Sequence, residues 1–172
     1  MRIGPWRLAD GYRVEPFEGQ DEIAAADVVA FWEAEGVLSA QEREERVHEL
    51  LLVARAPDGT LAGVTTAYLE REPQLGATMW WVRGLVGAAH RGSAVGYWLG
   101  VRSREVLARR FAEGADTRGS GVLFQLENEE LARAFPMAVW PTMGFRFYAR
   151  NVAGQDLRVH WFDGALAPEP PS

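Results

Sequence analysis

An Asp58-Gly59 pair between two apolar runs limits the fold of this chain more than any other feature. An Asp-Gly dipeptide readily adopts the positive φ angles of a tight turn between antiparallel strands. The run before it, residues 50–54, consists of Leu-Leu-Leu-Val-Ala and has no polar face, which is typical of a strand inside a sheet. The run after it, roughly residues 61–70, predicts the returning strand. The chain therefore contains an antiparallel hairpin, and a fold made only of repeated βαβ units is excluded.

The same patterns place most of the other elements. Period-two alternation predicts a strand at 11–17, and a turn at 73–76 leads into an aromatic-rich strand at 78–86. Apolar residues at helical spacing between Val95 and Phe111 predict a helix of about four turns. The remaining elements expected are strands at 122–126, 145–149 and 157–162, with a helix at 128–135.

Two helices are expected between the first strand and the hairpin. Asp21 is the predicted N-cap of the first helix, and Gly36 ends it. Ser39 and Glu42 form a capping box, which predicts the start of a second helix that ends near residue 49. The buried face of the first helix is expected to carry Ile23, Ala26, Ala30 and Phe31.

The order of these elements predicts an α+β fold, with a mixed, mostly antiparallel twisted sheet of about seven strands and flanking helices. One crossover, from Val86 to Val122, joins parallel neighbours and is expected to be right-handed. We expect a single domain over residues 1–164. The proline-containing residues 165–172 are expected to be a disordered tail.

Composition excludes several classes of function. A net charge of −6 and a pI near 5.1 argue against nucleic-acid binding, which needs a basic surface. No apolar run approaches the ~18 residues that span a bilayer, and the N-terminus lacks a signal-peptide core. Cysteine is absent, which removes thiolate metal sites and cysteine nucleophiles. We therefore expect a cytoplasmic protein with no membrane or nucleic-acid partner and no metal.

The main candidate binding site follows the strand that ends at Val86. Small residues there let backbone N–H groups approach a ligand, and the first turn of the next helix adds unpaired N–H groups and a positive dipole end. Together they predict a phosphate-binding segment. Small residues also occur here simply to let a helix pack closely on a sheet, so both interpretations stay open. The segment consists of Arg91, Gly92, Ser93, Ala94, Val95 and Gly96.

This segment resembles the cofactor-binding signature of the GNAT acyltransferase superfamily, in which R/Q-x-x-G-x-G/A opens a helix. The chain has Arg91 and Gly96 at the outer positions, and Ala94 where the first glycine is usual. A second family element, an N-x-x-x-A-x-x-Y helix after the fifth strand, is similar to the run from Asn128 to Phe135. The order of elements matches the family over nearly the whole chain.

The resemblance implies a cofactor, a chemistry and residue roles. Acetyl-CoA or another acyl-CoA would place its pyrophosphate on residues 91–96, and Asn128 and Phe135 would line the same cofactor. Its pantetheine arm would hydrogen-bond the fourth strand at Leu85 and Val86, between two splayed parallel strands. The amine of a small molecule or peptide would attack the thioester directly, without a metal. The implied function is an N-acyltransferase of the EC 2.3.1 type.

Phe135 departs from the family, which commonly has there a tyrosine that protonates the departing thiolate. The thiolate can leave unaided, since its thiol has a pKa of about 8.5. Alternatively, Tyr148 in the next strand supplies the hydroxyl. In the third alternative, the chain is a GNAT-like CoA-binding or regulatory module without transfer activity.

The general base has several candidates. Glu70 lies at the end of the third strand, with Glu72 nearby, and Glu127 ends the fifth strand. A carboxylate near the reacting amine can take its proton. Each of them is also explained as a solvated carboxylate at a strand end.

Trp80 and Arg83 are the candidates for substrate binding. Trp80 and its neighbour Trp81 point to opposite faces of their strand, so only one of them can line the acceptor site. Arg83 could hold an acidic group of the substrate, although an ion pair with a glutamate also explains it. Trp161 and Phe162 in the last strand are candidate contacts of a homodimer. The sequence leaves the acceptor amine and the acyl-chain length open.

Overall fold

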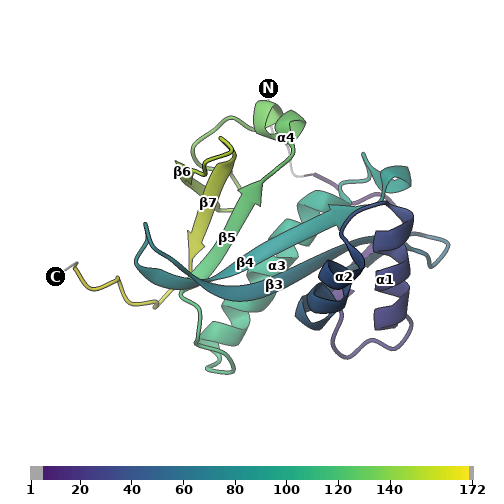
Figure 1. The fold of residues 1–172 in the computed structure, drawn as a ribbon, viewed down its shortest axis with the longest axis horizontal. Coiled ribbons are helices and arrows are strands. Elements are labelled where there is room, and N and C mark those ends of the chain that lie inside the picture. The colour runs from purple at the N-terminus through teal and green to yellow at the C-terminus, as the bar shows by residue number, and fades with distance from the viewer. Residues whose placement is uncertain (1–5, 171–172) are drawn as a thin grey trace. The chain divides into compact units, whose positions relative to one another are not determined.

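The computed structural model of the chain describes residues 6–170, without the side chains of Glu130 and Leu131. The predicted order of strands and helices is confirmed (Figure 1). No helix among the described residues is long and apolar enough to cross a membrane. The elements are β1 (Arg13–Pro16), α1 (Ala25–Ala34), α2 (Ala40–Arg46), η1 (Val47–Glu49), β2 (Leu50–Arg55), β3 (Leu61–Glu72), β4 (Ala77–Val86), η2 (Ala88–His90), α3 (Val95–Ala112), β5 (Gly121–Leu126), α4 (Glu129–Ala134), β6 (Arg146–Arg150) and β7 (Asp156–Trp161).

In the described part of the chain, seven strands form one sheet in the order β1-β2-β3-β4-β5-β7-β6. The pairs β1–β2, β2–β3, β5–β7 and β6–β7 are antiparallel. β4 and β5 are parallel, with Trp80 opposite Val122 and Val82 opposite Phe124. The chain between these two strands contains α3. The predicted mixed, mostly antiparallel sheet with a central parallel pair is therefore confirmed.

The chain divides into two compact units that share its longest elements. Unit 1 comprises the described residues up to Ala67 together with Arg83–Ser103, and unit 2 comprises Tyr68–Val82 together with the described residues from Arg104 onward. β3, β4 and α3 therefore contribute to both units. Each unit has an apolar core of its own. The expected single domain over 1–164 and tail over 165–172 stay predictions, and residues 1–5 and 171–172 lie outside the described residues.

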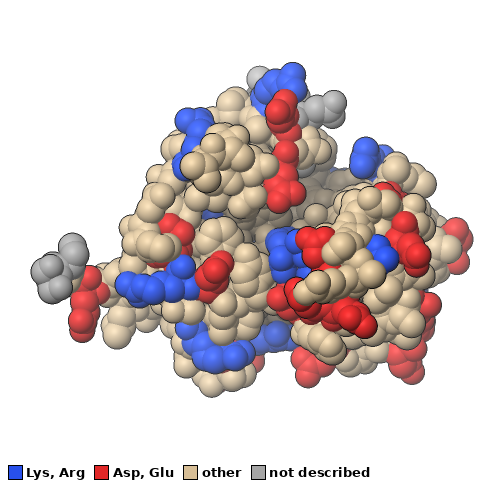
Figure 2. All heavy atoms as spheres, viewed as in Figure 1, with Lys and Arg blue, Asp and Glu red and all other residues tan. Residues whose placement is uncertain are grey.

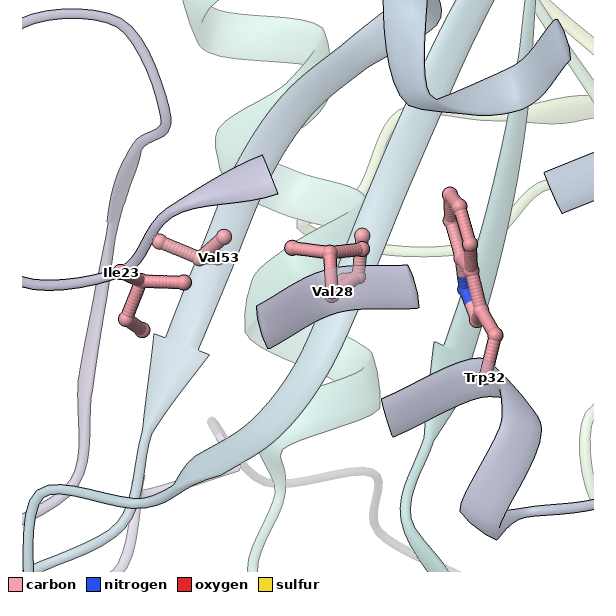
Figure 3. Packing of buried hydrophobic residues seen from close by; sticks show 5 residues of the cluster. Ile23, Val28, Trp32 and Val53 are labelled. Atoms are coloured by element: carbon pink, nitrogen blue, oxygen red, sulfur yellow. The ribbon is translucent and has the colours of Figure 1, made fainter. Parts of the chain in front are cut away.

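The core of unit 1 lies between α1 and the hairpin of β2 and β3. Val28 and Trp32, one helical turn apart, pack in the same buried cluster as Val53 and Val64, which pair across the hairpin. Figure 3 shows Ile23, Val28 and Val53 side by side, with Trp32 one turn further along α1. The Asp58-Gly59 turn that joins the two strands is present, and Gly59 has the positive φ of +85° that such a turn requires.

The start of α1 differs from the prediction. Asp21 is not the N-cap: the helix begins after Ala24, whose N–H donates to the Asp27 carboxylate at 2.8 Å. The side chain of Gln20 bonds both the N–H and the carbonyl oxygen of Ile23, at 2.8 and 2.7 Å, and so holds residues 20–23 in a turn. The helix therefore starts later than local cap preferences indicate.

The later start also changes the buried face of α1. Val28 and Trp32 are buried, whereas Ala26 and Ala30, expected on that face, are exposed. Turning Val28 and Trp32 toward the core buries more apolar surface than turning the two alanines there would, so the helix presents that face. The capping box of α2 is confirmed, since Ser39 Oγ accepts from the Glu42 N–H at 3.2 Å and Glu42 Oε2 accepts from the Ser39 N–H at 2.7 Å.

The core of unit 2 lies on one face of β4, β5 and β7. Its buried members are Ala77, Met79, Leu123 and Val159, and the half-buried Leu75, Trp81, Tyr148 and Trp161 pack against them. Residues 165–170 form no helix or strand, but Pro168 lies 3.4 Å from where a Cβ at Gly76 would be. Phe162 is buried and packs on Phe111, with ring centroids 5.2 Å apart, so of the two candidate homodimer contacts only Trp161 keeps an exposed part.

Candidate cofactor site

The segment predicted to bind phosphate, residues 91–96, runs from the end of η2 into the first turn of α3. Gly92 has a φ of +85°, and Ala94, immediately before α3, has a φ of +64°. A residue with a Cβ in this left-handed region costs about 1–2 kcal/mol relative to the right-handed one. Ala94 therefore holds the backbone conformation that the glycine of the resembled signature favours. Alanine in place of glycine at position 94 therefore changes the side chain but keeps the left-handed backbone conformation.

The two glycines of the segment play different parts. A Cβ at Gly92 would meet no atom within 4 Å, and Arg91 and Gly92 are both exposed. A Cβ at Gly96 would lie 3.3 Å from the Val86 side chain, so glycine lets α3 pack closely on β4. Of the two interpretations that the sequence left open, close packing thus applies to Gly96, whereas Gly92 faces open space.

Ser93 is buried and holds the segment in shape through hydrogen bonds to neighbouring residues. It is 8% exposed, and its Oγ donates to the carbonyl oxygen of His90 at 2.5 Å and accepts from the Val95 N–H at 3.4 Å. Its backbone N–H also donates to the carbonyl oxygen of His90, at 3.4 Å. The Ser93 side chain therefore sets the shape of the segment and is already occupied.

Contacts with the N-terminal part of the chain hold the same region. The hydroxyl of Tyr12 lies 3.0 Å from His90 Nδ1, and the Ala9 N–H donates to the Ser93 carbonyl oxygen at 3.0 Å. Trp98 Nε1, on the first turn of α3, donates to the carbonyl oxygen of Trp6 at 2.7 Å. No local pattern signals these partners, because they lie roughly 80 to 90 residues apart in the chain.

The end of β4 is fixed within unit 1. Leu85 is half-buried and packs against the unit 1 core, and the Gly87 N–H donates to the carbonyl oxygen of Ala62 at 2.9 Å. Arg83 forms an ion pair with Glu49, both side chains being about a third exposed. The ion pair that the sequence offered as an alternative role for Arg83 is therefore present.

Asn128 and Phe135 lie at either end of α4 in unit 2. Asn128 is exposed, and its carbonyl oxygen accepts from the Ala132 N–H at 3.0 Å as the helix begins. The Phe135 ring is half-buried and meets Trp140 edge to face, with ring centroids 6.3 Å apart. Glu127, just before this helix, is exposed and accepts from Gln125 Nε2 at 3.3 Å.

The other candidate carboxylates lie at the end of β3. Glu70 is exposed, whereas Glu72 is 6% exposed and its Oε1 accepts from the Gln74 N–H at 3.0 Å. Tyr148 is half-buried, and burial, followed by the charge of Glu72, raises the pKa of its hydroxyl well above the ordinary value. The sequence placed Glu72 beside Glu70 but contained no signal that Glu72 alone would be buried.

Trp80 and Trp81 have different neighbours, as their alternation along β4 predicts. The Trp80 ring lies against Gly119, and the guanidinium of Arg118 lies 5.5 Å from its centroid. The Trp81 ring stacks on Tyr68, with centroids 6.3 Å apart and planes at 20°. Trp81 also packs against the unit 2 core.

Acidic side chains and possible metal ligands are the remaining features that could mark a site. Figure 2 shows acidic side chains gathered over α1 and α2 on the visible face, where Glu42, Glu44 and Glu45 are exposed. Among the described residues, no group of three or more His, Cys, Asp or Glu side chains is arranged to hold a metal ion.

Comparison with known proteins rests on solved structures, because no protein-family model and no curated protein matches the chain. An acetyltransferase of the GNAT family from Streptococcus pneumoniae superposes with a TM-score of 0.54 at 13% identity, covering 86% of this chain and 96% of that one. The chain has the GNAT fold.

Two further structures show the same likeness. The ribosomal-protein-S5-alanine acetyltransferase from Vibrio fischeri has a TM-score of 0.58 at 12% identity, covering 91% of this chain and 96% of that one. NAA60 from Arabidopsis thaliana in complex with acetyl-CoA has a TM-score of 0.54 at 15% identity, covering 89% and 99%. The GNAT fold thus extends over most of the chain, and at these identities the likeness concerns the fold.

Proposed function

We propose that the protein is an acyl-CoA-dependent N-acyltransferase that moves an acetyl or related acyl group to a primary amine. The observation that carries the proposal is the backbone of the phosphate-binding segment. Gly92 is exposed with open space in front of it, and Ala94 adopts a glycine-like conformation at the start of an 18-residue helix. This arrangement presents N–H groups and a positive helix end to an anion.

Backbone N–H groups of Gly92, Ala94 and Gly96 and the Arg91 side chain would hold the pyrophosphate, and Leu85 and Val86 would bond the pantetheine arm. Asn128 and Phe135 would line the same cofactor. The fold is shared with a structure that holds acetyl-CoA, which supports this assignment.

In the proposed reaction, the amine nitrogen forms a bond to the thioester carbonyl carbon, and the carbon–sulfur bond then breaks to release the CoA thiolate. The amine loses one proton to a base, for which Glu70 and Glu127 are candidates, both exposed. The Phe135 side chain has no proton to give to the thiolate. Tyr148 is the candidate donor, although its raised pKa makes it a weak acid. We further propose a cytoplasmic location.

Thermal stabilisation by CoA tests the cofactor half of the proposal, because a ligand that binds only the folded state raises the melting temperature. We expect CoA to stabilise the wild-type chain and to stabilise Arg91→Ala less. Arg109→Ala, an exposed arginine in the last turn of the same helix, is the matched control and should respond as the wild type does. No stabilisation at millimolar CoA would contradict the proposal.

Release of free thiol from acetyl-CoA in the presence of an amine tests the transfer half. Phe135 favours a second candidate, a CoA-binding module without transfer activity. That module would be stabilised by CoA, but none of a broad panel of amines would release thiol.

A further inference from the structure

Three aromatic rings lie together in unit 2, and the charge of one buried carboxylate acts on one of them. Tyr68 of β3 stacks on Trp81 of β4, and Trp81 and Tyr148 of β6 pack against the same apolar cluster. All three rings are half-buried, so part of each remains accessible. Glu72, at the end of β3, is 6% exposed.

Two hydrogen-bond donors in this group have no acceptor among the described residues. Trp81 Nε1 and Tyr148 Oη are buried, and neither has a hydrogen-bond partner among the described residues. An indole N–H can only donate, and a buried donor without a partner costs about 1–3 kcal/mol. Buried polar groups in folded proteins almost always have partners. These two donors are therefore available to an acceptor that the described residues do not supply.

Glu72 is a hydrogen-bond acceptor and carries a negative charge. One of its oxygens accepts from the Gln74 N–H at 3.0 Å. Burial, and after it the charge of Glu72, raises the pKa of the Tyr148 hydroxyl above an ordinary value that already keeps it protonated and able to donate at neutral pH. A carboxylate beside aromatic rings attracts an ammonium group, through its charge and through cation–π contacts. The face thus offers two donors and one anion.

We propose that Glu72, Trp81 and Tyr148 form the acceptor subsite of the transferase, and that its substrate is an amine with a carbonyl or carboxylate oxygen close to the nitrogen, as in an amino acid or a peptide N-terminus. The ammonium group binds between Glu72 and the rings, and the oxygen accepts from Trp81 and Tyr148. This inference rests on the proposed function. An alkylamine or a polyamine leaves both donors unpaired, so it binds less well.

Nuclear magnetic resonance tests the subsite without relying on turnover. The indole N–H signal of Trp81 is assigned by its loss in Trp81→Phe. We expect glycinamide to shift this signal in the CoA-bound protein, and ethylamine, which lacks the oxygen, to shift it much less. Trp161→Phe is the matched control, since Trp161 packs against the same cluster, and it should leave the response of Trp81 unchanged. Equal shifts with both amines, or none with either, overturn the proposal and indicate a bound water only.

Kinetics and stability together separate a binding role from a packing role. Tyr148→Phe removes an unpaired buried donor, so its melting temperature should equal or exceed that of the wild type. Its kcat/KM should fall about tenfold for glycinamide, the effect of losing one hydrogen bond to the substrate, and stay unchanged for ethylamine, whereas loss of a proton donor to the thiolate would lower both; stabilisation by CoA is retained. A lower melting temperature with unchanged kcat/KM contradicts the proposal.

The two proposals fail in different ways. If glycinamide shifts the Trp81 signal but no amine releases thiol, the transferase fails and the amine-binding face stands. If thiol is released equally well with glycinamide and ethylamine, the transferase stands and the subsite fails.

Discussion

The guanidinium of Arg158 lies 4.1 Å from the centre of the Trp140 ring and donates to the carbonyl oxygen of Met137 at 2.8 Å. Arg158 is 1% exposed and belongs to β7, whereas Trp140 follows α4. Trp140 is itself buried, and its Nε1 donates to the carbonyl oxygen of Phe135 at 3.0 Å. Two buried side chains, the Arg158 guanidinium and the Trp140 indole, therefore hold the segment after Phe135 against the rest of unit 2.

Replacing Arg158 should destabilise the protein far more than replacing Arg150, although both pair with Asp156 at 3.1 Å. Arg158→Met leaves the Met137 carbonyl oxygen without its donor and removes the contact with the Trp140 ring, and we expect the free energy of unfolding to fall by about 1–3 kcal/mol. The Arg150 side chain is 62% exposed, so Arg150→Met should cost less than about 1 kcal/mol. Urea denaturation of both variants measures the difference, and equal losses would show that burial is not the cause.

Substitutions at Ala94 and Gly92 should change stability in opposite directions. Ala94→Gly relieves a positive φ and should raise the free energy of unfolding by about 1 kcal/mol, whereas Gly92→Ala should lower it by a similar amount. Because a Cβ at Gly92 would meet no atom within 4 Å, its loss reports the backbone alone. Denaturant titrations give both values. An unchanged free energy of unfolding in Ala94→Gly would mean that residue 94 does not hold its positive φ in solution.

Gly63→Ala should disturb the packing of α3 on the sheet. Its Cβ would lie 2.9 Å from Leu99 Cδ1 and 3.0 Å from the Leu85 carbonyl oxygen, which is backbone and cannot turn away. We expect a loss of about 1–3 kcal/mol, as for other overpacked sites. Gly96→Ala, whose Cβ would be 3.3 Å from a Val86 methyl group alone, should cost less. Thermal unfolding of the two variants ranks them, and the reverse order would contradict this account.

Stability should fall on mild acidification because of His160. Burial lowers the pKa of His160 and outweighs its hydrogen bond to the Gly144 carbonyl oxygen, which acts in the opposite direction. The unfolded state therefore takes up a proton first, so this contribution is complete above the ordinary pKa of about 6.5 and is lost as pH falls through it. His160→Asn should flatten the dependence of the unfolding free energy on pH between about 7.5 and 5. Parallel curves for variant and wild type would exclude His160 as the cause.

Phe135→Tyr tests whether thiolate protonation limits the proposed transfer. A thiol with a pKa of about 8.5 leaves readily as the thiolate, so we expect kcat to change less than tenfold. Rates of thiol release across a range of pH measure the effect. A larger increase, confined to the pH range in which the new hydroxyl is protonated, would show that the family's tyrosine is missed in this chain.

Local sequence predicts an element well where the deciding contacts are themselves local. The capping box joins Ser39 and Glu42, three residues apart, and it is present as expected. The N-cap at Asp21 fails because Gln20 holds the chain in a turn up to Ile23, a competing local contact that cap preferences do not weigh. The same limit applies to the buried face of α1, which depends on what β2 and β3 present to it.

By itself, the sequence determined the order of strands and helices, the Asp58-Gly59 turn and the small residues of the segment predicted to bind phosphate, because each depends on neighbours within a few residues. Only the tertiary structure decided which carboxylate of β3 is buried, that Tyr12 meets His90, and that Trp81 and Tyr148 share one core. These relationships join residues far apart in the chain. They depend on how the sheet brings strands together, which no local pattern specifies.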